Sequence, residues 1–211
     1  MNYVQSRTSI PIPPIVDKQI GADDDENSWI LMKKLPGQQL GKAWPTMTER
    51  AKTQAISELK SYLEQLHRLR PSDPGWIGSC SKGPAYDHRL DNMRTCGPFE
   101  SVREFHDFLV APVKNSPRPE WAARYRTLLS DNHAIIFTHA DISGENILVD
   151  GVTGTVTGIL DWEMAGFWPE WWEFRKALFG GRGQLWWINI VKEIMKQYPT
   201  ETEADMDLEM F

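Results

Sequence analysis

Two short stretches contain residue types that can do chemistry: His139, Asp141 and Asn146, and then Asp161 and Glu163. A carboxylate such as Asp141 can orient a hydroxyl group and accept its proton, which is worth roughly 10²–10⁴ in rate. Mg²⁺ prefers hard oxygen ligands, which Asn146, Asp161 and Glu163 can supply. We expect Asp141 to be the catalytic base, and His139 to belong to the same loop and hold its shape.

The spacing of these residues is H-x-D-x-x-x-x-N, with an acidic residue 15 positions later. This spacing resembles the catalytic and metal-binding loops of the protein-kinase fold. In that template the loop aspartate is the base, while the asparagine and the second aspartate bind magnesium. The resemblance implies these roles for Asp141, Asn146 and Asp161.

Short apolar runs predict the strands that position both stretches. Strands are expected at 135–137, 147–149 and 156–160, so the H-x-D segment lies in a loop between the first two. Asp161 then ends the third strand. Further upstream, residues 8–36 predict two strands around an acidic turn.

Helices are predicted to fill most of the remaining chain. Thr46 and Glu49 have the spacing of a capping box, and apolar residues then recur at helical spacing until Pro71. The other expected helices cover 100–111, a segment starting near Pro119, 169–179 and 184–198.

The sequences around the two stretches, FTHADISGENILVD and GILDWEMAGFWPEWWEFRKALF, narrow the resemblance. They resemble the aminoglycoside phosphotransferase and choline kinase-like family, especially its fungal small-molecule-kinase-like branch. The upstream segments IPIPPIV, WILMKKLPGQQL and GPFESVREFHDFL fit the same family. The resemblance extends from about residue 8 to residue 198.

This resemblance implies an α+β, protein-kinase-like fold. The expected parts are a remnant of the N-terminal lobe sheet with the hinge strand (1–40), a mainly helical C-terminal lobe with short β-hairpins (41–200) and an acidic flexible tail (201–211).

The resemblance implies an N-terminal lobe with a glycine-rich loop followed by a strand lysine, and this pair of features does not precede Trp29 here. Only Lys18 precedes Trp29 in a strand context, and the late run 180–183 follows a helix and lacks the Lys-Ser/Thr ending of a P-loop. We therefore expect a truncated N-terminal lobe and a reduced nucleotide site. The expected cofactor is Mg²⁺ with ATP if phosphoryl transfer is retained, and otherwise none.

Three functions remain open. The first is a small-molecule O-phosphotransferase with this reduced site. The second is an ATP-independent acid/base catalyst of natural-product biosynthesis, such as a cyclase, lyase or isomerase. The third is a non-catalytic pseudokinase.

The chain has ten tryptophans, and six of them lie between residues 162 and 187. They can form a core between two helices, or an aromatic wall beside Asp141 for a flat or apolar substrate. The candidate wall residues are Trp162, Trp168, Trp171 and Trp172.

Composition excludes several partners. The net charge of −6 argues against nucleic acid or an anionic membrane, and no apolar run reaches the roughly 18 residues of a membrane helix. Two cysteines and an N-terminus without a signal-like apolar core favour the cytoplasm. We expect a small-molecule substrate, and the edge near Ile10–Val16 could form a homodimer.

Overall fold

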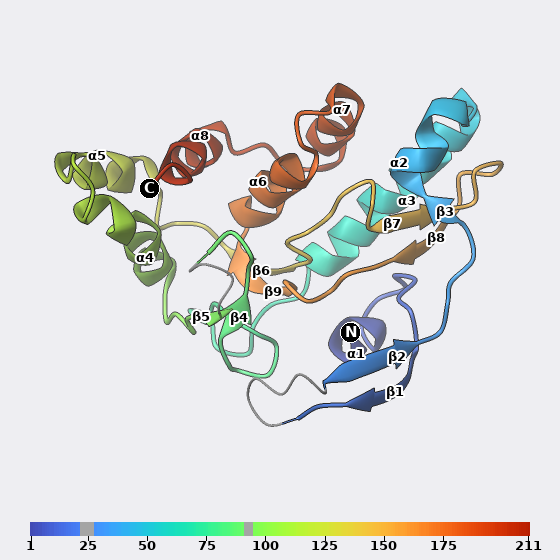
Figure 1. The fold of residues 1–211 in the computed structure, drawn as a ribbon, viewed down its shortest axis with the longest axis horizontal. Coiled ribbons are helices and arrows are strands. Elements are labelled where there is room, and N and C mark those ends of the chain that lie inside the picture. The colour runs from blue at the N-terminus through green and yellow to red at the C-terminus, as the bar shows by residue number, and fades with distance from the viewer. Residues whose placement is uncertain (22–27, 91–94) are drawn as a thin grey trace. The chain divides into compact units, whose positions relative to one another are not determined.

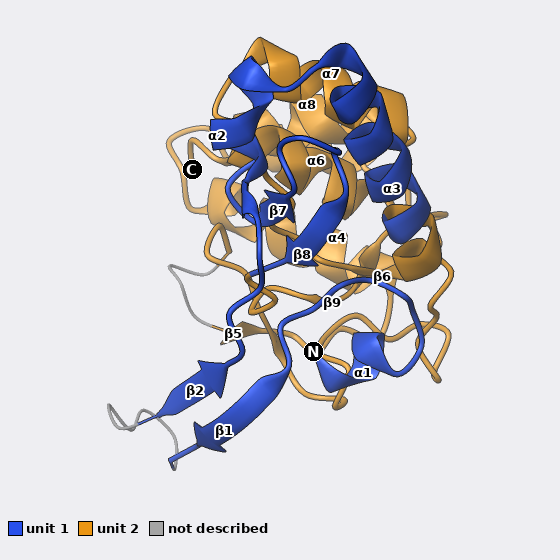
Figure 2. Ribbon diagram, turned by 90° about the vertical axis from the view of Figure 1, so that its right-hand side faces the viewer, with its two compact units in different colours: residues 1–62, 144–160 blue, residues 63–143, 161–211 orange. Residues whose placement is uncertain are grey.

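The computed structural model describes residues 1–21, 28–90 and 95–211. These divide into two compact units, coloured separately in Figure 2, which contain residues 1–62 with 144–160 and residues 63–143 with 161–211. The units interleave along the chain, whereas the sequence led us to expect three consecutive segments.

The first unit begins with the short helix α1 (Asn2–Gln5) and a hairpin of β1 (Ile15–Gln19) and β2 (Trp29–Met32), seen in blue in Figure 1. The two predicted strands are confirmed, but the predicted turn 23–27 lies outside the described residues. Every side chain of β2 is exposed, from 44% at Trp29 to 53% at Leu31. A two-stranded sheet in water is marginally stable at best.

A second sheet of the same unit has the order β3–β7–β8, with β3 at Gln38–Gln39, β7 at Ile147–Val149 and β8 at Val156–Ile159. The predicted strands at β7 and β8 are confirmed, and they pair antiparallel. The turn between them requires Gly154, because its φ is +81° and an added Cβ would lie 1.9 Å from the Ala51 carbonyl oxygen.

Helix α2 (Leu40–Ala43) and a 3₁₀ turn (Trp44–Thr46) lead into the long helix α3 (Glu49–His67). The predicted capping box at Thr46 is wrong, because the 3₁₀ turn includes Thr46 and the helix starts later. Instead the Thr48 hydroxyl accepts a hydrogen bond from the Ala51 N–H at 3.2 Å. The predicted apolar stripe of α3 is buried, namely Ala51, Ala55, Leu59, Leu63 and Leu66.

The second unit contains the small ladder β4 (Ala85–Tyr86) with β5 (Thr95–Cys96), and the adjacent helices α4 (Val102–Lys114) and α5 (Glu120–Leu128) (Figure 1). Helix α4 begins where the Ser101 hydroxyl accepts the Glu104 N–H, while the Glu104 carboxylate accepts the Glu100 N–H. This reciprocal cap explains why the predicted helix forms.

Strand β6 (Ile135–Thr138) was predicted, but its partner β9 (Gly166–Pro169) was not. All four β9 residues are buried, so the strand lacks the polar alternation that would have revealed it in the sequence. Helix α6 (Trp171–Gly180) follows directly, and α7 (Leu185–Ile194) packs beside it.

The expected flexible tail is instead the helix α8 (Pro199–Leu208), which contacts α4, α5 and α6. The prediction failed because the acidic residues are not solvated. Asp205 has no exposed surface, and Arg175 Nε donates to its carboxylate at 2.8 Å. No helix within the described ranges is long and apolar enough to cross a membrane.

Candidate active site

The H-x-D segment lies between β6 and β7, as predicted, and its backbone is held by a buried carboxylate. Glu173, on α6, accepts hydrogen bonds from the N–H groups of His139 at 2.7 Å and Ala140 at 3.0 Å. Ala140 has φ of +61°, a left-handed conformation that costs a residue other than glycine roughly 1–3 kcal/mol. Glu173 therefore stabilises the unusual backbone that leads into Asp141.

His139 is fully buried and shapes the same turn. Its Nδ1 accepts the backbone N–H of Asp141 at 3.2 Å, and its ring lies 4.5 Å from the Trp162 ring. A ring nitrogen that accepts a hydrogen bond has no proton of its own. This contact supports the view that His139 orients the loop.

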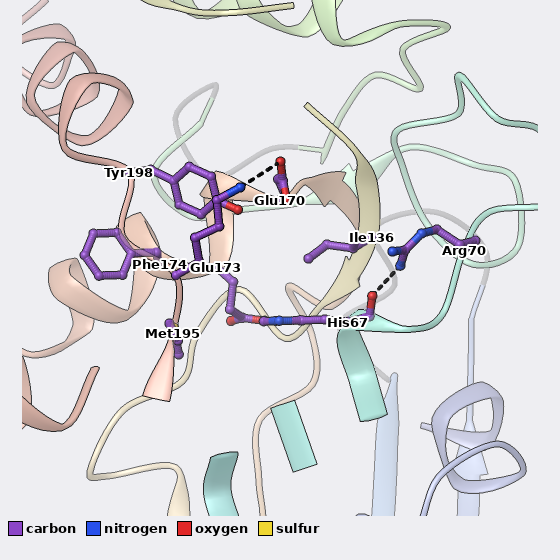
Figure 3. Close-up of a pocket in the computed structure, with 9 residues that line it drawn as sticks. His67, Arg70, Ile136, Glu170, Glu173, Phe174, Met195 and Tyr198 are labelled. Carbon is purple, nitrogen blue, oxygen red and sulfur yellow. Dashed lines mark hydrogen bonds and ion pairs between the residues drawn. The ribbon is translucent and has the colours of Figure 1, made fainter. Parts of the chain in front are cut away.

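Glu173 is supported from its other side by His67, the last residue of α3. His67 Nε2 lies 3.6 Å from Glu173 Oε2, at the wall of a cavity of about 200 Å³ that also includes Phe174 and Tyr198 (Figure 3). Burial alone would raise the pKa of Glu173, but His67, His139 and the backbone N–H groups outweigh it and lower that pKa. The carboxylate is therefore ionised, and sequence reasoning missed it because its partners lie more than 30 residues away.

Glu163 lies within electrostatic reach of Asp161 and Asp141. Burial raises the pKa of Glu163, and the negative charges of Asp161 and Asp141 raise it further. Asp161 has φ of +62°, so its backbone is also in the left-handed region. Magnesium bound with phosphates needs only one or two protein carboxylates, and a cation would relieve the repulsion among these groups. These carboxylates are donors of the hard oxygen type that Mg²⁺ prefers.

Asn146 lies in the first unit, directly before β7. Its backbone carbonyl accepts the N–H of Leu160 at 2.8 Å, and Leu160 is the residue before Asp161 in the sequence. Across the described residues, no three or more His, Cys, Asp or Glu side chains form a ready-made metal site.

Tyr86 and His88, at the end of β4 and after it, feel the charges of Glu163 and Asp161, and no local sequence pattern predicts this. Burial and then the charge of Glu163 raise the pKa of Tyr86. The next residue, Asp87, is fully buried, and it accepts hydrogen bonds from Lys176 Nζ at 2.7 Å and Trp172 Nε1 at 3.0 Å. This buried ion pair ties the segment after β4 to α6.

The four candidate wall tryptophans have different surroundings. Trp168, Trp171 and Trp172 have no exposed surface, and their rings pack around Phe105 on α4. No substrate reaches these three side chains in this structure. Trp162 is 8% exposed and packs on His139.

A family model described as the phosphotransferase enzyme family matches residues 1–206. The clavilactone A biosynthesis cluster protein Y of Ampulloclitocybe clavipes is 25% identical over 197 residues, which cover 80% of this chain and 48% of that protein. An aminoglycoside 3′-phosphotransferase of Streptomyces ribosidificus is 24% identical over 163 residues, which cover 74% of this chain and 54% of that protein. The chain thus spans about half the length of these relatives.

Solved structures show the same fold. The GDP and kanamycin complex of APH(2″)-IIIa superposes with a TM-score of 0.62 at 16% identity, over 98% of this chain and 68% of that one. The structure of aminoglycoside phosphotransferase APH(4)-Ia superposes with a TM-score of 0.63 at 15% identity, over 99% of this chain and 72% of that one. The predicted α+β, kinase-like fold is confirmed.

Proposed function

Because the chain belongs to the phosphotransferase enzyme family, we propose that it takes part in phosphoryl transfer from Mg-ATP to a hydroxyl group of a small molecule. The observation that carries the proposal is the H-x-D loop, whose backbone at His139 and Ala140 is held by the buried carboxylate of Glu173 and leads into Asp141. The negative charges of Asp161 and Asp141, which raise the pKa of Glu163, support it. A structural loop alone has no need for three carboxylates that repel one another.

Asp141 would orient the acceptor hydroxyl and accept its proton as the hydroxyl oxygen bonds to the γ-phosphorus. The bond from that phosphorus to the bridging oxygen breaks, and ADP leaves. His139 and Glu173 keep Asp141 in place, since both hydrogen-bond to the backbone of this loop. Positioning of this kind, with charge stabilisation, supplies most of the catalysis in phosphoryl transfer.

In the second unit, Asp161 is the proposed protein ligand of Mg²⁺, with Glu163 as a further carboxylate whose pKa its charge raises. Asn146 is proposed as a ligand on its position in the H-x-D-x-x-x-x-N motif alone. Bound magnesium would neutralise charge on the phosphate oxygens. Without the metal, the three carboxylates would repel the phosphates.

The test is transfer of labelled γ-phosphate from Mg-ATP to a panel of hydroxylated small molecules. The wild type should label at least one acceptor, and Asp141→Asn should slow transfer by roughly 10²–10⁴-fold. The matched control is Asp73→Asn, whose exposed ion pair with Lys82 lies outside the site. Equal rates in the wild type and Asp141→Asn would refute Asp141 as the base.

A further inference from the structure

A large cavity opens in the second unit beside α4 and α8. Its volume is about 750 Å³, within the range of small-molecule sites. Its lining combines the polar side chains of Arg89, Asn115 and Glu209 with apolar ones, among them Leu90, Phe108, Leu109, Phe179, Leu208 and Phe211. Phe179 is 38% exposed, so part of its ring faces solvent.

The charged side chains of this cavity neutralise each other. Arg89 Nη2 donates to the carboxylate and the backbone carbonyl of Asp205, and its Nε lies 3.3 Å from Glu209. Glu209 also accepts from Arg175, on α6. Among the lining residues that the structure describes, Glu209 is the carboxylate, and Arg89 and Arg175 already pair with it, so this lining favours an uncharged ligand.

One lining residue of the cavity precedes a residue that lies close to the proposed base, Asp141. A Cβ built on Gly180 would lie 3.9 Å from Asp141 Oδ1, and Phe179, the residue before it, lines the cavity. The ring of His88 lies 5.5 Å from the Phe179 ring, and the charges of Glu163 and Asp161 act on His88. Two consecutive residues at the end of α6 thus lie at the cavity and near Asp141, respectively.

Resting on the proposed function, we propose that this cavity binds the body of the phosphate acceptor, and that the acceptor is an uncharged, ring-containing alcohol or phenol. Its rings would lie against Phe179 and Phe108 while its hydroxyl reaches Asp141. This substrate class differs from that of the aminoglycosides, which carry several positive charges.

The test is calorimetric titration with 2-naphthol, an uncharged ring-containing probe, in the absence of nucleotide. We expect saturable binding to the wild type, with a negative heat-capacity change because apolar surface is buried. Ala111→Phe, which adds bulk inside the cavity, should weaken binding at least tenfold, and so should Phe179→Ala. The control Ala123→Phe places the same ring at an exposed site on α5 and should leave binding unchanged.

Ala111→Phe fills the cavity and Phe179→Ala enlarges it, so a folding defect of one variant would not explain weaker binding in both. Absence of binding to the wild type, equal binding in all variants, or displacement of 2-naphthol by kanamycin would overturn the inference. Labelled phosphate transfer separates the two proposals. If 2-naphthol binds but phosphate is transferred to no acceptor, the proposed function is rejected and the assignment of the cavity as a ligand site stands. If phosphate is transferred to kanamycin alone, the proposed function stands and the assignment of the cavity is rejected.

Discussion

The fully buried carboxylate of Glu173 accepts the N–H of His139 at 2.7 Å. Glu173→Gln would set an amide N–H against one of the two loop donors, so we expect a loss of about 1.5–3 kcal/mol in unfolding free energy. The rate constant kcat should fall more than KM changes, because Asp141 would be misplaced. Glu203→Gln, at an exposed site on α8, is the control. A folded Glu173→Gln protein with full kcat would contradict this role.

His106 should make stability depend on pH. Its Nε2 accepts the Trp171 indole N–H at 3.2 Å and its Nδ1 lies 3.1 Å from Asp131 Oδ1, so the folded protein holds the neutral ring. Burial lowers the pKa of His106 to about 4, while Asp131 opposes that shift. The unfolded chain therefore binds one more proton between pH 6.5 and 4.

Stability should consequently fall by about 3 kcal/mol as pH drops through that window. His106→Gln keeps an acceptor for Trp171 but cannot titrate, so its denaturant midpoint should vary less with pH. The measurement is urea unfolding at several pH values. Identical pH profiles for the two proteins would rule out His106 as the cause.

The ion pair of Lys176 with Asp87 has no exposed surface on either side chain. Lys176→Met should cost about 3–5 kcal/mol, because it leaves the Asp87 carboxylate buried without its cation. The double variant Lys176→Met/Asp87→Leu should recover much of that loss. Lys192→Met, at an exposed position of α7, serves as the control in the same denaturant series. A loss below 1 kcal/mol in the single variant would argue against this contribution.

Asp205 tests whether α8 is part of the folded unit. Asp205→Asn removes the anion that pairs with Arg175 and Arg89, and we expect a loss of about 3–5 kcal/mol in thermal or denaturant unfolding. Asp73→Asn, in an exposed ion pair, should change stability by less than about 1 kcal/mol. Equal unfolding free energies for Asp205→Asn and the wild type would contradict this role and favour a flexible tail.

The sequence predicted elements whose signal is local. The strands around the H-x-D loop and the buried stripe of α3 are periodic, and both were correct. Strand β9 was missed because it is buried on both faces, and α8 was missed because its buried Asp205 is paired with arginines far away in the chain. From the sequence alone an acidic residue is expected to be solvated, because basic partners that are distant in the chain cannot be identified.

The residues of the candidate site also divide into those that a local sequence pattern predicts and those that depend on distant contacts. Asp141 and Asp161 were identified from their spacing, whereas Glu173, His67 and the Asp87–Lys176 pair were not. These residues act through contacts between segments separated by 30 to 110 positions, and no short motif contains them.

The central claim is that Asp161 belongs to a site for Mg-ATP, and thermal unfolding with and without Mg-ATP tests it most directly. A ligand at about 100 times its Kd adds about 2.7 kcal/mol, which for a chain of this size raises Tm by roughly 5–10 °C. We predict this rise for the wild type and for Asp73→Ala, and its loss in Asp161→Ala. No rise in the wild type at millimolar Mg-ATP, or an equal rise in Asp161→Ala, would contradict the account.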